Sequence, residues 1–247
     1  PGMLNEKEKL EAMALLGNEL NQFHDLDILM ERVLTKARRF ANADAGSIYI
    51  KHGGCLHFSY TQNDTLQGRL KNGEKLIYTN FTLPIDERSI AGYVAFTGIP
   101  LNIPDVYNIA PDRPYRFLKT FDRASDYQTH SVMTLPLKTA REELVGILQI
   151  INAQDSEGRI VEFSRDDQRM MTHFASIASV ALERAQMTRA IFMRMISMAR
   201  MRDPKETGAH VNRVAAYSIE IYEAWARKRN TPESEIDAKR DILRMAA

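Results

Sequence analysis

The sequence predicts an α+β protein in which helices flank an antiparallel sheet, followed by a long connecting helix and the start of an all-α domain. Two observations predict this fold class. Alternating apolar segments joined by short turns occur between residues 47 and 153 and indicate hairpins, with amphipathic segments before and after them. The stretch from Ser164 to Asp203 contains neither glycine nor proline and carries apolar residues at three- and four-residue steps. A helix of that length is roughly 60 Å long, so it joins two parts of a protein.

Composition restricts the possible partners and the compartment. The chain of 247 residues has 33 Lys and Arg against 32 Asp and Glu, and this near balance predicts neither nucleic acid nor an anionic membrane as a partner. No apolar run approaches the roughly 18 residues that a membrane-spanning helix needs. The lone Cys55 excludes a disulfide framework and suits a reducing compartment, so we expect a cytoplasmic protein.

The first part of the chain is expected to contain two helices and a hairpin. Residues 1–24 hold an amphipathic helix from Glu6 to Phe23, and Asp25 is expected to cap a second helix that ends near Ala41. The apolar side of the first helix is expected to be Leu10, Met13, Ala14, Leu20 and Phe23. Strands at 47–50 and 56–60 flank a turn with two glycines, a hairpin signal.

The middle of the chain continues with short elements. A strand is expected near Leu76–Phe81, a helix over Asp86–Thr97, and an extended segment over 100–105. Residues 108–129 show no regular pattern, and a loop of this length inside a compact domain is usually a lid or a binding loop. Residues 131–153 predict a second hairpin.

The long helix is expected to begin at the cap Ser164 and to end before Pro204. Its main apolar seam consists of Met171, Phe174, Ala178, Ala181, Ala185, Thr188, Phe192, Met195 and Ala199. A second apolar row consists of Ile177, Val180, Met187, Ile191 and Met198. Because one chain is not expected to cover the seam, we predict a parallel homodimer through the N-terminal and long connecting helices.

Residues 85–185 resemble a GAF domain. The segments that carry the resemblance occur in that family's order: 89–98 (SIAGYVAFTG), 100–106 (PLNIPDV), 131–137 (SVMTLPL), 145–149 (VGILQ) with Asn152, and 163–167 (FSRDD). The resemblance implies a six-stranded antiparallel sheet with a small-molecule pocket on one face, roofed by the helix near Ile90 and by the irregular loop. It also implies dimerisation through the first and last helices. We expect the sensor domain to cover residues 25–187 and the connecting helix 188–203.

Eight polar or aromatic residues are the candidates for the pocket of this domain. They are Tyr49, Ser89, Tyr93, Tyr107, Arg113, Tyr115, Thr134 and Gln149. Arg113 is expected to lie in the lid and to pair with an anionic ligand. Each of the eight has an alternative role in the core or in a loop.

The GAF domains that bind cyclic nucleotides carry an Asn-Lys-Phe-Asp-Glu signature. Asn152, Phe163 and Asp167 fit it, whereas Ala153 and Gln168 replace the lysine and the glutamate. The resemblance therefore implies that the lysine–aspartate bridge of the signature is missing here and that a cyclic nucleotide is a poor candidate ligand.

Residues 198–247 resemble the beginning of an HD-GYP phosphodiesterase domain. The carriers are 202–204 (RDP), 206–210 (ETGAH), Arg213-Val214 and the apolar ending 242–247. The resemblance implies hydrolysis of cyclic di-GMP at clustered metal ions, with Glu206 and His210 as ligands. A carboxylate and an imidazole four residues apart share a helix face and suit iron, manganese or zinc. That family's His-Asp pair would follow such an ending, so we expect residues 204–247 to be a truncated domain and assign no catalytic residue in this chain.

These patterns together predict the sensory region of a bacterial-type signalling protein that controls an HD-GYP cyclic di-GMP phosphodiesterase. In this interpretation an unknown small molecule occupies the pocket, and the chain itself has no hydrolytic activity. Two alternatives remain: a ligand-free GAF dimerisation module, and the regulator of an HD phosphohydrolase that acts on another nucleotide.

Overall fold

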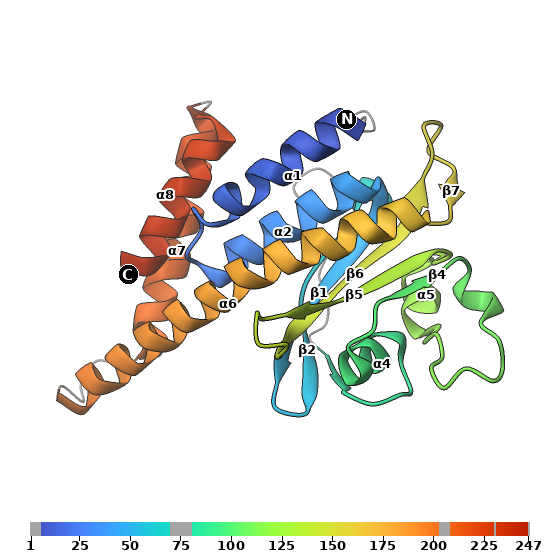
Figure 1. Ribbon diagram of the computed structural model, residues 1–247. Helices are drawn as coiled ribbons and strands as arrows, with labels where there is room; N and C mark the ends of the chain where they lie inside the picture. The colour runs from blue at the N-terminus through green and yellow to red at the C-terminus, as the bar shows by residue number, and fades with distance from the viewer. Residues whose placement is uncertain (1–5, 70–80, 203–207, 230, 247) are drawn as a thin grey trace. The chain divides into compact units, whose positions relative to one another are not determined.

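The computed structural model describes residues 6–69, 81–202, 208–229 and 231–246 (Figure 1). Its centre is one antiparallel sheet with the strand order β3-β2-β1-β6-β5-β4, and β7 pairs with β6. The strands are β1 Ala43–His52, β2 Cys55–Asn63, β3 Thr82–Pro84, β4 Leu101–Ile103, β5 Val132–Lys138, β6 Leu144–Gln154 and β7 Ile160–Val161. The described chain thus has seven strands where six were implied, because the short β7 extends the sheet.

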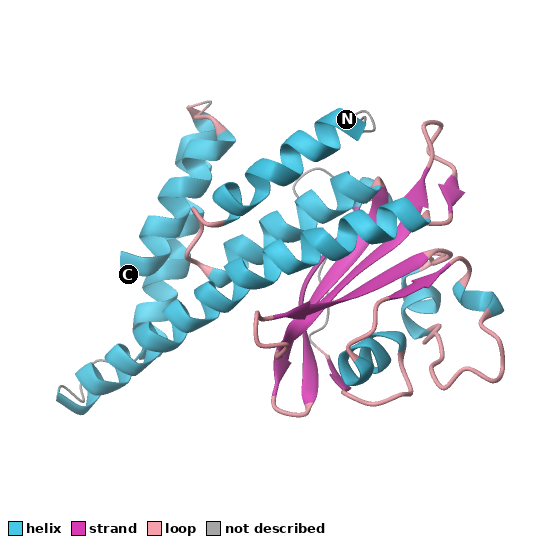
Figure 2. Cartoon of the chain, in the orientation of Figure 1, coloured by secondary structure: helices cyan, strands magenta, loops and turns pink. Residues whose placement is uncertain are grey.

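Helices lie on both faces of this sheet. The helices of the described chain are α1 Glu6–Leu20, α2 Leu26–Ala41, α3 Asp64–Gly68, α4 Ile90–Thr97, the 3-10 turn η1 Val106–Asn108, α5 Thr120–Ser125, α6 Arg165–Arg202, α7 Gly208–Lys228 and α8 Glu233–Ala246. The ribbon places α2 and the first half of α6 over one face and α4 and α5 over the other (Figures 1 and 2). The α+β prediction is therefore confirmed.

The chain divides into two compact units. One contains the residues before Asn18 together with Met30–Val180, and so holds the whole sheet; the other contains Asn18–Leu29 and the residues from Ala181 onward. In the second unit the acid Glu223 of α7 is buried and lies 3.2 Å from Arg240 of α8. A buried acid of this kind requires such a partner.

Side-chain caps fix where two of the helices begin. Asp25 Oδ1 accepts hydrogen bonds from the backbone N–H groups of Asp27 and Ile28, both at 3.0 Å, at the start of α2. At α6, Ser164 Oγ accepts from Asp167 N while Asp167 Oδ2 accepts from Ser164 N, both at 3.0 Å. These reciprocal bonds satisfy amides that the helix itself leaves unpaired. Both predicted caps are confirmed.

The core between the sheet and its outer helices is closely packed. Phe40 of α2 and Phe174 of α6 contact each other with ring centroids 5.6 Å apart. The predicted apolar side of α1 is only partly correct, because Leu10 is 65% exposed whereas Leu16 is fully buried. Leu16 and Leu20 lie four residues apart and therefore share a face, which is the face that α1 buries.

The prediction of an exposed main seam on α6 is wrong for its first half. Its members Met171, Phe174, Ala178, Ala181 and Ala185 are buried within the chain itself. The exposed apolar face is instead the second row, where Val180, Met187, Ile191 and Met198 are each more than half exposed. We call these four residues the outer stripe. Their seven- and four-residue steps place them on one side of α6.

The segment between β4 and β5 has more structure than expected. The sequence predicts an irregular loop over 108–129, but residues Thr120–Ser125 form α5, and the buried Asp122 lies in its centre. The helix expected over Asp86–Thr97 begins later, at Ile90, because Ser89 caps it. Most of the strand expected near Leu76–Phe81 lies outside the described residues.

Candidate ligand-binding cavity

A cavity of about 460 Å³ lies between the sheet and the α4–α5 side of the same unit. The volume is within the range of small-molecule sites in proteins. The lining side chains are mostly apolar or aromatic. They include Tyr49, Phe58, Phe81, Leu83, Ile90, Phe117, Leu118, Phe121, Val132 and Ile151.

Polar side chains on the strands form part of the floor. Ser47 Oγ and Thr61 Oγ1 are 3.2 Å apart, and the Thr61 hydroxyl donates to the carbonyl oxygen of Gly46 at 2.9 Å. Gln149 Nε2 donates to Thr134 Oγ1 at 2.9 Å. Thr134 is fully buried and does not line the cavity, so it orients the Gln149 amide from the neighbouring strand β5.

An aromatic cluster closes one end of the cavity. The rings of Phe58 and Phe81 are stacked with centroids 4.6 Å apart, and Tyr49 meets Phe58 edge-on at 5.4 Å. Burial raises the pKa of the Tyr49 phenol far above its ordinary value, and the nearby Ser47 hydroxyl opposes this shift. The phenol is therefore protonated, and this wall carries no charge.

The roof is attached to the start of α4. Ser89 Oγ accepts from Gly92 N at 3.0 Å, and the backbone N–H of Arg116 donates to the carbonyl of Arg88 at 2.9 Å. The Arg116 guanidinium donates to the carbonyls of Pro111 and Tyr115 at 2.8 and 2.9 Å, and to that of Arg113. Its hydrogen bonds thus hold the loop before α5 in shape.

Asp122 anchors α5 to the chain that leads into β5. Its carboxylate accepts three hydrogen bonds of 2.8 Å, from Tyr107 Oη, Thr129 N and Thr129 Oγ1. The bond to Asp122 also raises the pKa of the Tyr107 phenol. Asp122 lines the cavity, so the position of this wall depends on it.

Replacing Asp122 by alanine should therefore loosen α5. We expect the opening free energy of the amides in Thr120–Ser125 to fall by about 2–3 kcal/mol, since charged hydrogen bonds are lost and Thr129 N loses its acceptor. Hydrogen exchange of the whole chain measures this effect. Asp112→Ala, at an exposed site, is the matched control and should change protection by less than about 0.5 kcal/mol. Equal protection in both variants would contradict the anchoring role.

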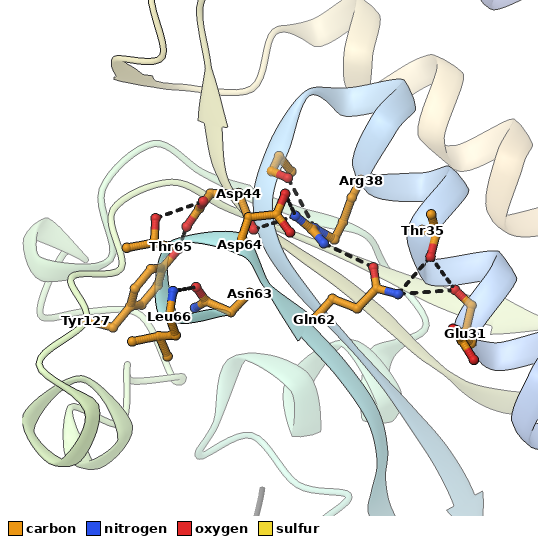
Figure 3. A network of polar contacts seen from close by, with 11 residues as sticks. Glu31, Thr35, Arg38, Asp44, Gln62, Asn63, Asp64, Thr65, Leu66 and Tyr127 are labelled. Atoms are coloured by element: carbon orange, nitrogen blue, oxygen red, sulfur yellow. Dashed lines mark hydrogen bonds and ion pairs between the residues drawn. The ribbon is translucent and has the colours of Figure 1, made fainter. Parts of the chain in front are cut away.

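A second polar network joins the cavity wall to α2 (Figure 3). The buried Asp44 accepts from Tyr127 Oη at 2.7 Å and from Thr65 Oγ1 at 2.9 Å. Burial raises the pKa of Tyr127 far above its ordinary value, and the hydrogen bond to Asp44 adds to the shift. Tyr127 also accepts from Asn152 Nδ2 at 2.9 Å, so three segments meet at one phenol.

On the opposite face of the sheet, Gln62 continues this network into α2. Its Nε2 donates to Thr35 Oγ1 at 2.7 Å and its Oε1 accepts from Arg38 Nη1 at 3.1 Å. Arg38 also donates to the carbonyls of Ala43 and Asp44, and it pairs with Asp64 (Figure 3). The buried guanidinium thus ties α2 to the ends of both β1 and β2.

Because Tyr49 and Tyr127 are buried, we expect the folded chain to lose stability at alkaline pH. Below the ordinary tyrosine pKa of 10, both are protonated in the folded and unfolded states. Above it, the unfolded chain releases protons that the folded chain retains, so each tyrosine lowers the free energy of unfolding by up to about 1.4 kcal/mol per pH unit. Urea midpoints measured upward from about pH 9 should show this slope. Tyr127→Phe should reduce it, with the exposed Tyr217→Phe as the control for the substitution; an unchanged slope would contradict the assignment.

The structure brings three of the eight predicted pocket residues to the cavity. Tyr49, Ser89 and Gln149 line it, and Thr134 lies behind Gln149. Tyr93 and Tyr115 instead pack on each other, with centroids 4.9 Å apart.

The remaining two candidates do not line the cavity either. Tyr107 bonds to Asp122 from outside, and the exposed Arg113 contributes backbone hydrogen bonds to Arg116 and Ala110. The basic residue that lines the cavity is Arg116, three positions after the predicted one.

Sequence reasoning also missed Asp122, Tyr127 and the Ser47–Thr61 pair. The alternation along the first hairpin contained a signal for Ser47 and Thr61, since it places both on the face opposite Gly46 and Gln62. Asp122 and Tyr127 lie in the segment without periodicity, where no pattern indicates burial.

The three signature residues have structural roles. Phe163 is buried, and its carbonyl oxygen accepts from Asn102 Nδ2 at 2.9 Å. Asn152, at a positive φ of 56°, donates to Tyr127 and Gln128 and accepts from His130 N. Asp167 caps α6 and lies 3.6 Å from Lys9 Nζ of α1. Ala153 stands where the signature has its lysine. A lysine from a different element, Lys9 of α1, pairs with Asp167 instead.

The described residues do not test the predicted metal ligands Glu206 and His210. Glu206 lies outside the described residues, and His210 is placed only by the backbone of α7. Among the described residues no group of three or more His, Cys, Asp or Glu side chains is arranged to hold a metal ion. Within those same limits, no helix has the length and apolar character that crossing a membrane requires.

Comparison with known families and proteins is consistent with this architecture. The family described as GAF domain matches residues 25–182. A dual 3′,5′-cyclic-AMP and -GMP phosphodiesterase 11 of Drosophila melanogaster is 25% identical over 197 residues, and phosphodiesterase 11A of Takifugu rubripes is 27% identical over 191. Each match covers 74% of this chain but only 12% and 19% of those proteins.

Solved structures show the same fold at low identity. The GAF domain of a phosphoenolpyruvate-protein phosphotransferase from Coxiella burnetii aligns with a TM-score of 0.55 and 19% identity, over 76% of this chain and 99% of that one. The free methionine-R-sulfoxide reductase of Neisseria meningitidis, in complex with its substrate, aligns with a TM-score of 0.54 and 15% identity, over 76% and 96%. At these identities the likeness concerns the fold alone.

Proposed function

Because the chain belongs to the GAF family, whose domains are regulatory and sensory modules, we propose that it senses a small molecule for a cytoplasmic signalling protein. The observation that carries this proposal is the cavity of about 460 Å³ beneath α4 and α5. A ligand bound there would stabilise one arrangement of the roof and floor. It changes the rest of the chain only if it binds two conformational states of the chain with different affinities.

The controlled activity in this proposal is hydrolysis of cyclic di-GMP by an HD-GYP domain. The support is the resemblance of residues 198–247, together with helices α7 and α8 at those positions. Glu206 and His210 are the residues of this chain that would help to hold iron, manganese or zinc, and the metal would polarise the phosphodiester. Two ligands do not complete such a site, so we expect only background hydrolysis by this chain in metal-supplemented assays.

The chain is also proposed to act as a homodimer. The outer stripe of α6 supports this, because four apolar side chains with near-heptad spacing are exposed on one long helix. A second copy of α6 presents the same stripe and can cover it symmetrically. The N-terminal helix α1 adds the exposed Leu10 and Leu15 as further apolar surface.

Native mass spectrometry of the purified chain tests the proposal, because it reports the oligomer and any retained small molecule together. A dimer that carries a bound metabolite, released on denaturation, is the expected result. A dimer whose cavity never binds a small molecule in ligand screens would favour the alternative of a ligand-free dimerisation module. If a longer chain carries the rest of the HD-GYP domain, its turnover of cyclic di-GMP and of other nucleotides distinguishes the two candidate substrates of the effector.

A further inference from the structure

A line of polar side chains crosses the cavity floor at right angles to the strands. In register, Thr61 of β2 pairs with Ser47 of β1, Ser47 pairs with Gln149 of β6, and Gln149 pairs with Thr134 of β5. Directly paired residues on one face of a sheet are neighbours, so these four side chains form a continuous row. We call it the polar row.

Apolar side chains flank the polar row on both sides. The paired residues toward one end of the strands are Tyr49, Phe58 and Ile147, and those toward the other end include Ala45, Ile151 and Val132. Asn63 also lines the floor, opposite Ala45, and its side-chain oxygen accepts from Leu66 N. Apart from Asn63, a flat ligand that covers the floor would therefore meet hydrogen-bonding groups mainly along one line. Its remaining surface would contact aromatic and aliphatic carbon.

The polar row has hydrogen-bonding capacity toward the cavity. The Gln149 amide uses one N–H for Thr134, and its second N–H and its oxygen have no hydrogen-bond partner among the described residues. Because the Thr61 hydroxyl donates to Gly46 O, Ser47 donates to Thr61 and its oxygen lone pairs remain as acceptors. The half-exposed Gln149 thus offers a donor and an acceptor side by side.

The charged groups among the described lining residues already form hydrogen bonds within the protein. These groups are Arg116 and Asp122. Both oxygens of Asp122 accept hydrogen bonds within the protein, and Arg116 donates to three backbone carbonyls. A fixed charge on a ligand inside the cavity would therefore lose its hydration, and it would gain a partner only by displacing these hydrogen bonds.

We propose that the cavity selects an uncharged, planar heterocycle with a lactam-type edge, an adjacent N–H and C=O, which pairs with Gln149. This inference rests on the proposed function, since it specifies the ligand of the same cavity. The amide of Gln149 pairs with the lactam edge through two hydrogen bonds, and the ring packs between the rows that flank it, with the aromatic cluster at its end. The arrangement discriminates against the charged cyclic phosphate of a cyclic nucleotide.

Isothermal titration of the full chain with matched probes tests this assignment. Hypoxanthine has the lactam edge, and purine is the same ring system without it. We expect hypoxanthine to bind at least about tenfold more tightly than purine, because purine leaves the Gln149 amide unpaired. Guanosine and cyclic GMP share a base and differ in charge, and we expect cyclic GMP to bind at least about tenfold more weakly.

Substitutions in the polar row make the test specific. Gln149→Met keeps the length of the side chain and removes the amide, so the preference for hypoxanthine over purine should fall below about threefold. Gln154→Met on the same strand lies outside the cavity lining and should retain the preference. Circular dichroism of both variants verifies that they are folded.

Several results would overturn the assignment. If cyclic GMP binds as tightly as guanosine, the cavity accepts a charged ligand. If Gln149→Met keeps the preference for hypoxanthine over purine, the Gln149 amide does not recognise the lactam edge. If none of the neutral probes binds, the assignment is also wrong. A metabolite retained in native mass spectra would in that case still support the sensory function, so the two proposals can fail independently.

Discussion

Replacing Gly146 by alanine is expected to destabilise the centre of the sheet by about 3 kcal/mol, the upper part of the range for overpacking. A Cβ atom built on Gly146 of β6 would lie 2.2 Å from the carbonyl oxygen of Tyr49 on β1. The contacting atom belongs to the backbone, so no side-chain rotation relieves the clash. The two central strands would have to separate, and the hydrogen bonds between them would lengthen.

Hydrogen exchange resolved to β1 and β6 measures this effect where it arises, without assuming that the two compact units unfold together. The control is Gly68→Ala in α3, because a Cβ there meets nothing within 4 Å and φ is not positive. We expect the control to change protection by less than about 0.5 kcal/mol. Unchanged protection of β1 and β6 in Gly146→Ala would mean that the strands shift without strain.

The second large effect is expected for the homodimer. Met187→Glu combined with Ile191→Glu puts charges into the outer stripe of α6, and each charge would have to lose water when a second copy covers it. We expect the dissociation constant of the dimer to rise by at least about 100-fold. Sedimentation at tens of micromolar should then show a monomer.

The matched control adds the same charge to other exposed positions of α6. Met193→Glu with Ser197→Glu leaves the outer stripe intact and should preserve the dimer. Arginines at Ala181 and Ala185 would not be informative, because both alanines are buried within the chain and the substitution would disturb its packing. If the unmodified chain sediments as a monomer, the dimer proposal is wrong.

Sequence reasoning predicted the elements whose signals are local. The caps at Asp25 and Ser164 and the glycine turn of the first hairpin depend on a few neighbouring residues, and the structure has all of them. The register of β1, β5 and β6, which assembles the polar row, depends on long-range pairing. No local pattern specifies which residue of β6 lies opposite Ser47.

A sequence also does not show which element an apolar helix face packs against. The 3.5-residue period of α6 identified two apolar rows correctly, but it could not tell which row packs inside the chain. Tertiary packing decided this in favour of the row that holds Phe174, which contacts Phe40 of α2, and the fully buried Ala178. For the cavity, Gln149 and Ser89 were found because they belong to recognisable segments, whereas Asp122 lies in a segment without periodicity.

The hydrogen bonds of Gln62 make the floor of the cavity stiffer than its roof. Thr61 faces the cavity, and the next residue, Gln62, is held by Thr35 and Arg38 of α2 on the opposite face. One peptide unit therefore connects the floor to a helical layer, and the floor cannot yield without displacing that layer. The roof at α5 is held by Asp122 and by Arg69, which donates to the carbonyl oxygens of Ser125 and Asp126, and neither of these contacts reaches that helical layer. We therefore expect thermal motion, and the displacement that an entering ligand causes, to be larger in the roof than in the floor.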